Sequence, residues 1–228
     1  MQKALYFSQV IDRHFRKYLF GRFRKCTETI RGVFQVVKKN KQSVDDLLAA
    51  SFKELACQQP IEKITIKQIT DKAGVIRPTF YNHFQDKYNL LEWILIKELV
   101  TPVQPLLSAG MINEALILIF HNMEKEKDFY MHASKLQGQN SFRNLVEQGI
   151  SFVLCSMIVE KMGIKKPINK WLTPEHLSEY YTQSMTYILM TWIQSGMEIP
   201  PEELAQVYDF IISRSLSDVL EDMWAVPL

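Results

Sequence analysis

The segment from Thr65 to Lys87 constrains the fold of this 228-residue chain more than any other stretch. A first helix over about residues 66–73 is predicted by apolar residues at helical spacing, namely Ile66, Ile69 and Ala73. Thr65 is a good N-cap, and Gln68 can reach back to complete a capping box. Gly74 follows where the chain needs a left-handed turn. The pattern therefore predicts a short helix followed by a sharp turn.

A second short helix is predicted to begin near Arg77 and to end before Asp86, which caps a further helix. Pro78 falls in its first turn, where a missing N–H does no harm. Phe80 and Phe84 are four residues apart and are expected to face inward. The residues left facing outward are Arg77, Thr79, Tyr81, Asn82 and His83. A short helix with one buried aromatic edge and one hydrogen-bonding edge suits insertion into the major groove of DNA.

This helix-turn-helix resembles the DNA-binding domain of the TetR family of bacterial transcriptional regulators. The matching residues are Thr65, Ala73-Gly74-Val75, Thr79-Phe80-Tyr81-Asn82-His83-Phe84, Asp86-Lys87 and Leu90-Leu91. The resemblance is detailed from about Ser43 to Leu91, and beyond it only the family's architecture carries over. One departure is Ile76, because the family usually has Ser or Thr there. Ile76 can neither cap the second helix nor touch a phosphate through a hydroxyl.

The resemblance implies double-stranded operator DNA as a partner and assigns candidate contacts to it. The side chains expected to contact phosphates are Thr65, Thr79, Tyr81, His83 and Lys87. Lys67 is a further cation of this segment. Those nearest to base edges are Arg77, Pro78 and Asn82. Arg77 would suit guanine.

The composition favours an all-α protein of the cytoplasm. Gly and Pro are few, and apolar runs keep helical rather than strand periodicity. Three distant cysteines predict a reducing compartment, with Cys57 as a small core residue. No window has the uninterrupted apolar length of a membrane span. Because glycine-rich phosphate loops, nucleophile elbows and HExxH motifs are absent, no enzymatic activity, cofactor or metal is expected.

The net charge of +2 is unevenly spread along the chain. Residues 1–40 hold ten Lys/Arg against two Asp/Glu, residues 41–110 hold eight of each, and residues 111–228 hold nine against fifteen. Residues 1–40 form a basic extension for which three interpretations stay open. They are an arm that adds phosphate contacts, an amphipathic helix for anionic membrane, or a poorly structured segment.

Two domains are expected after the extension: a helix-turn-helix domain over 41–92 and a helical regulatory and dimerisation domain over 93–228. A helix is predicted from about Val44 to Gln58, and another from Asp86 toward a break formed by prolines 102 and 105 and Gly110. In the second domain, helices are predicted near 111–124, 127–136, 141–162, 174–195 and 201–223.

Two functional surfaces are expected in the second domain. Met and aromatic residues can line an adaptable cavity, and the candidates for ligand contact are Phe120, Met157, Met185 and Met190. The resemblance implies that the last two helices form a four-helix bundle across a two-fold axis. The candidates for this homodimer interface are Ser184, Tyr187, Ile188, Thr191, Ile211 and Ser215.

The function predicted from these features is sequence-specific DNA binding that controls transcription. Operator affinity would be set by a small-molecule or protein effector in the C-terminal domain, through a shift between two populations. The alternative is a helical sensor or adaptor that acts by protein contact, with a helix-turn-helix that does not read sequence. Ile76 and the neutral charge of residues 41–110 give this alternative its support.

Overall fold

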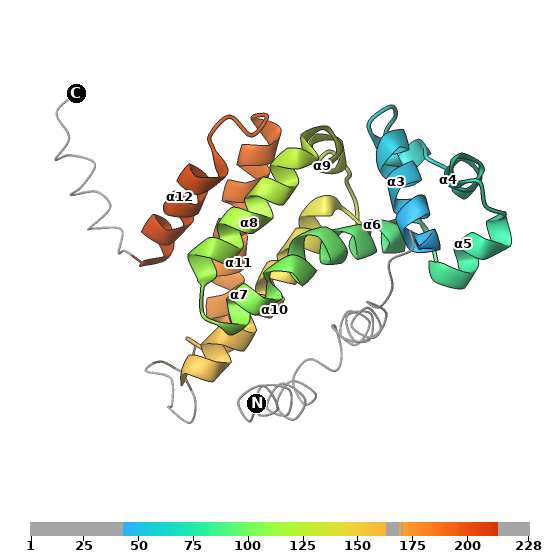
Figure 1. Ribbon diagram of the computed structural model, residues 1–228. Coiled ribbons are helices and arrows are strands. Elements are labelled where there is room, and N and C mark those ends of the chain that lie inside the picture. The colour runs from blue at the N-terminus through green and yellow to red at the C-terminus, as the bar shows by residue number, and fades with distance from the viewer. Residues whose placement is uncertain (1–42, 163–168, 170, 214–228) are drawn as a thin grey trace. The chain divides into compact units, whose positions relative to one another are not determined.

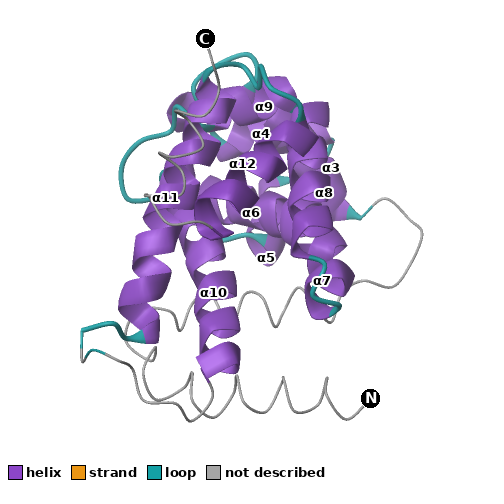
Figure 2. Ribbon diagram, turned by 90° about the vertical axis from the view of Figure 1, so that its left-hand side faces the viewer, coloured by secondary structure: helices purple, strands orange, loops and turns teal. Residues whose placement is uncertain are grey.

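The computed structural model describes residues 43–162, 169 and 171–213. All regular structure in that part of the chain is helical, which confirms the predicted all-α class (Figure 2). The helices are α3 (Val44–Ala56), α4 (Ile66–Ala73), α5 (Arg77–His83), α6 (Lys87–Leu95), α7 (Thr101–Ser108), α8 (Ile112–Lys125), α9 (Lys127–Ala133), α10 (Phe142–Met162), α11 (Pro174–Gln194) and α12 (Pro201–Ser213). Two short segments complete the order, the 3-10 turn η1 (Ile61–Lys63) and the π-helical η2 (Ile96–Val100).

The helix-turn-helix forms as the sequence predicts. The Thr65 hydroxyl accepts a hydrogen bond from the Gln68 amide, and the Gln68 side chain accepts from the Thr65 amide. Gly74 ends α4 in the left-handed region at a φ of 68°. At the start of α5, Ile76 makes no side-chain capping bond and Pro78 lies in the first turn.

The aromatic edge of α5 closes the core of this three-helix unit. Phe80 is fully buried and Phe84 nearly so. The Phe84 ring lies 5.8 Å from the Trp93 ring of α6 in a T-shaped contact. Burial of these large rings contributes much of the free energy that holds a seven-residue helix in place, because so short a helix is not stable alone.

The end of α3 differs from the prediction. The helix ends at Ala56, and Cys57 is its exposed C-cap, so the expectation that Cys57 is a core residue is wrong. The buried face of α3 runs through Leu48, Phe52 and Ala56, and Cys57 lies off that face.

The connecting helix also differs from the prediction, because it does not break at either proline. It runs from α6 through η2 into α7, and ends where Gly110 takes a φ of 76°. Pro102 lacks the N–H that the Glu98 carbonyl would receive in a regular helix. The Asn122 side chain donates to that carbonyl instead, at 3.0 Å. The proline is thus tolerated because a neighbouring helix supplies the missing donor.

The C-terminal helices lie beside the helix-turn-helix unit, and their buried side chains belong to the same hydrophobic core (Figure 1). Helix α10 packs along α11, and α12 packs on α8. The Phe120 ring lies 5.6 Å from the Trp192 ring and 5.3 Å from the Tyr208 ring, which joins α8, α11 and α12. The Tyr208 hydroxyl donates to the Met185 carbonyl at 2.6 Å. The helices predicted for this domain are present, and the part of the last one beyond residue 213 lies outside the described residues.

Candidate nucleic-acid interface

The outer edge of α5 carries the side chains predicted to read DNA. Arg77, Pro78, Tyr81 and Asn82 are exposed, and Thr79 is half-buried. Arg77 Nη2 donates to the Tyr81 hydroxyl at 3.3 Å, and its guanidinium carbon lies 5.7 Å from the centre of the Tyr81 ring. This contact places the guanidinium beside the Tyr81 side chain. The edge therefore offers an oriented cation together with neutral hydrogen-bonding groups.

His83 and Thr65, both predicted to contact phosphates, already have partners within the protein. His83 Nδ1 lies 2.6 Å from the Asp45 carboxylate of α3. The Thr65 hydroxyl donates to Gln68 Oε1 at 2.9 Å within the capping box. His83 can donate to Asp45 and to a phosphate together only when both ring nitrogens carry protons. Lys67 is different, because its exposed ammonium has no partner among the residues described.

Lys87, also predicted to contact a phosphate, is held by partners within the protein. Its ammonium donates to three backbone carbonyls, those of Ile61 at 2.8 Å, Glu62 at 2.6 Å and Ile64 at 2.8 Å. An ammonium has three donors, so none is left for a phosphate. Burial lowers the pKa of Lys87, against the attraction of Glu62 and Asp86. This lysine therefore fastens the η1 turn to the start of α6.

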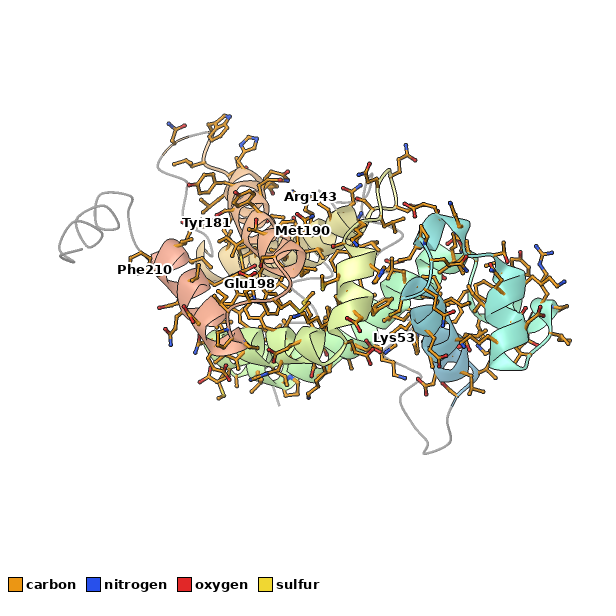
Figure 3. The ribbon with its side chains drawn as sticks, turned by 90° about the horizontal axis from the view of Figure 1, so that it is seen from above. Lys53, Arg143, Tyr181, Met190, Glu198 and Phe210 are labelled. Carbon is orange, nitrogen blue, oxygen red and sulfur yellow. The ribbon has the colours of Figure 1, made fainter. Side chains whose placement is uncertain are left out.

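A half-buried ionic cluster, which the sequence analysis missed, joins α3 to the C-terminal domain. Lys53 Nζ lies 2.7 Å from Glu98 Oε1 and 2.9 Å from Glu126 Oε1, and Figure 3 shows Lys53 where α3 meets the C-terminal helices. The Tyr130 hydroxyl donates to Glu98 Oε2 at 3.3 Å. Burial opposes the charge of Lys53, but the two carboxylates outweigh it and raise its pKa.

A second ion pair links the same two elements. Lys97 of η2 pairs with Asp46 of α3, and its ammonium lies 4.7 Å from the centre of the Trp93 ring. Together with Lys53 and Glu98, this pair ties α3 to two consecutive residues of η2. These two pairs are therefore contacts through which η2 and α3 touch each other directly.

The candidate ligand residues lie in the C-terminal core. Phe120, Met185 and Met190 are buried, and Figure 3 shows Met190 among the helices of that domain. Phe120 is engaged with Trp192 and Tyr208. The side chain of Met157 lies outside the described residues. Three of the four candidates are thus buried in the C-terminal part of the protein.

The candidate dimer residues are more exposed. Tyr187 is 66% exposed and Ile211 40%, while Thr191 is exposed and Ser184 and Ile188 are half-buried. Ser215 lies outside the described residues. Tyr180 at 69% and Ile212 at 39% extend the set. We call Tyr180, Tyr187, Ile211 and Ile212 the α11–α12 surface.

Other kinds of site find no support in the part of the chain that the structure describes. No group of three or more His, Cys, Asp or Glu residues there is arranged to hold a metal ion. Among the described residues, His121 contacts the carboxylates of Glu202 at 2.7 Å and Glu124 at 3.5 Å. Of the helices described, none has the length and hydropathy needed to cross a membrane.

Comparison with protein families gives two matches. A family model described as bacterial regulatory proteins, tetR family, matches residues 47–94. A second, described as a transcriptional regulator C-terminal region, matches residues 111–214. The first match contains the capping box, the left-handed glycine and the whole of α5.

Two curated proteins are similar in sequence. An uncharacterized HTH-type transcriptional regulator of Bacillus subtilis (strain 168), YxbF, is 25% identical over 177 residues, which cover 76% of this chain and 45% of YxbF. The dhaKLM operon transcriptional activator DhaS of Lactococcus lactis subsp. lactis (strain IL1403) is 26% identical over 84 residues, which cover 37% of this chain and 45% of DhaS. The chain thus matches less than half the length of either relative.

Two solved structures share the fold. The dihydroxyacetone kinase operon activator DhaS superposes with a TM-score of 0.54 at 19% identity, covering 76% of this chain and 94% of that one. The fatty acid degradation regulator FadR from Bacillus halodurans gives a TM-score of 0.53 at 15% identity, covering 78% and 98%. At such identities the likeness establishes the fold alone.

Proposed function

Because the chain belongs to the TetR family of bacterial regulatory proteins, we propose that it is a sequence-specific DNA-binding transcriptional regulator whose operator affinity is set by an effector of its C-terminal domain. The observation that carries the proposal is α5 itself. A capped α4 and a left-handed Gly74 hold α5 with its aromatic edge buried and its hydrogen-bonding edge exposed. That is the arrangement a recognition helix needs to enter the major groove. In this proposal residues 41–92 are the DNA-binding domain, 93–228 the regulatory domain, and 1–40 a basic extension.

The DNA contacts fall into two groups. Arg77, Pro78 and Asn82 are proposed to meet base edges, because they are exposed on α5 and Arg77 is oriented by Tyr81. Phosphate contacts are proposed for Thr65, Lys67, Thr79, Tyr81 and His83. Thr65 would give up the bond from its hydroxyl to Gln68 to make this contact. Lys87 is left out of this group because its donors are already used.

We propose that the protein acts as a homodimer through the α11–α12 surface, with Ser184, Ile188, Thr191 and Ser215 as further contacts. Two recognition helices would then reach half-sites about 34 Å apart, one turn of DNA. Exposed tyrosine and isoleucine side chains on adjacent helices are typical of an interface. Tyr187→Glu should give a monomer by size-exclusion chromatography with light scattering, whereas Met111→Glu, at another exposed apolar residue, should stay dimeric. If the Tyr187→Glu protein is still a dimer, the dimer interface does not lie on the α11–α12 surface.

Effector control would pass through the ion pairs on η2. A small molecule or protein that repacks the helices around Phe120, Met185 and Met190 would shift η2, which is continuous with α7 and packs on α8. The pairs from Lys97 and Glu98 would carry that shift to α3 and so to α5. A ligand can move this equilibrium only by the difference between its affinities for the two states.

A competition experiment tests DNA reading directly. Sites selected from random DNA by the full chain are bound in the presence of random competitor, at several salt concentrations. Arg77→Ala should lower the preference for selected over random DNA by about tenfold or more, as expected for loss of a base contact. Lys67→Ala should weaken both equally. If Arg77→Ala keeps the full preference, Arg77 does not read bases; if no sequence is selected at all, the protein is not a sequence reader.

A further inference from the structure

Ile76 is the most exposed of the large apolar side chains in the described residues, at 70% of its surface. Single exposed apolar residues are common on proteins, so exposure alone indicates nothing. The position is what matters, because Ile76 directly precedes Arg77 and Pro78 of α5. Its side chain therefore stands at the leading end of the proposed recognition helix, the end whose residues approach base edges in helix-turn-helix proteins.

Ile76 has no evident structural role at this position. The neighbouring helices α3, α4 and α6 each begin with a side chain that caps them, Ser43, Thr65 and Asp86. Helix α5 has Ile76 as its N-cap residue, and Ile76 makes no capping bond. A hydroxyl or carboxylate there would stabilise α5, and an isoleucine forgoes that gain while exposing apolar surface to water. A benefit that arises only in a complex would explain both costs.

Base edges in the major groove carry one prominent apolar group, the C5-methyl of thymine. A branched aliphatic side chain can contact that methyl but cannot bond to a phosphate or to the polar base atoms. The contact needs only the side chain and uses no amide group of α5. Ile76 is also continuous with the proposed DNA surface through Arg77 and Pro78, which are both exposed.

We infer that Ile76 is a specificity residue that contacts the C5-methyl group of a thymine in each operator half-site. The inference rests on the proposed DNA-binding function and adds to it a base contact. Ile76, in place of the usual Ser or Thr, would then add a base contact where a phosphate contact is lost. A hydroxyl would have bound a phosphate of any sequence, whereas Ile76 favours thymine over cytosine at one place.

Replacement of thymine by uracil removes this methyl and leaves Watson–Crick pairing intact, which makes a direct test possible. Sites selected from random DNA by the full chain are synthesised with deoxyuridine at one thymine position at a time. Affinities are measured at fixed salt for the unaltered protein, for Ile76→Ser and for Met111→Ser. Met111 is a matched control, because it too is an exposed apolar N-cap without a capping bond, at the start of α8.

At one position per half-site, uracil should weaken binding by the unaltered protein and by Met111→Ser about fourfold, the change expected for one buried methyl group. The same replacement should leave Ile76→Ser unaffected, and this variant should lose its preference for thymine there. Its thermal midpoint should be equal or higher, since serine caps α5. Equal uracil effects in all three proteins, or full site preference in Ile76→Ser, would overturn the inference while leaving the proposed function intact. Failure of the unaltered protein to select any sequence would overturn both.

Discussion

Replacement of Lys87 by methionine distinguishes a structural role, hydrogen bonding to three carbonyls, from a contact with a DNA phosphate. Methionine keeps most of the length and the apolar stem of the side chain but removes the ammonium that donates to three carbonyls. A hydrogen bond from a charged donor contributes about 1.5–3 kcal/mol in a favourable site and less where water competes. The bonds to the Ile61 and Ile64 carbonyls are part-buried, whereas the bond to the Glu62 carbonyl is exposed.

About 1 kcal/mol for each part-buried bond and little for the exposed one gives an expected loss of about 2 kcal/mol in the free energy of unfolding. The loss is measured by urea titration, followed by the helical circular dichroism signal at several protein concentrations. The salt dependence of DNA binding should keep its slope, because no phosphate contact is removed. Reduced affinity should reflect only the smaller folded fraction.

Lys67→Met provides the matched control, since Lys67 is an exposed lysine of the same domain. It should leave the free energy of unfolding unchanged and lower the salt slope by about one. The opposite result for Lys87→Met, full stability with a slope lower by about one, would refute the structural assignment. It would show that the ammonium leaves the three carbonyls to bind a phosphate.

Two further predictions concern stability. Lys53→Met leaves Glu98 and Glu126 without a counter-charge and should lower the free energy of unfolding by about 2 kcal/mol, after allowance for partial exposure of the carboxylates. The folded pKa of Lys53 is raised above 10.5. The difference in free energy of unfolding between the two proteins should therefore be constant near neutral pH and be lost as pH rises through the folded pKa. A difference that instead grows with alkaline pH would contradict the ion-pair account. Gly74→Ala should cost about 1 kcal/mol in urea titration, since an added Cβ meets no atom within 4 Å and only the left-handed backbone at φ 68° opposes it; an unchanged stability would refute the strain argument.

The parts of the fold that the sequence predicted are those set by local chemistry. The capping box at Thr65, the turn at Gly74 and the start of α5 at Arg77 depend on residues within a few positions of one another. Their structural requirements can be read from side-chain type and spacing. The buried edge formed by Phe80 and Phe84 follows from helical periodicity in the same way.

The parts that the sequence did not predict depend on distant residues. Lys53 meets Glu98 and Glu126 across 45 and 73 positions, and no local pattern indicates such a pairing. The three carbonyls that hold Lys87 lie more than twenty positions before it. The continuous helix through Pro102 likewise needs a donor from another helix, Asn122. Tertiary contacts therefore decide these features against the local preference.

The two ion pairs between α3 and η2 run in opposite directions, because α3 supplies the acid in one and the base in the other. This arrangement favours one alignment of α3 along η2. In one pair α3 supplies the acid, Asp46, and in the other it supplies the base, Lys53. Their partners, Lys97 and Glu98, are consecutive residues of η2. An exchange of the two partners would set Lys97 against Lys53 and Glu98 against Asp46, so that both attractions would become repulsions. The pairs therefore favour the observed alignment of α3 on η2 over one in which the two partners are exchanged.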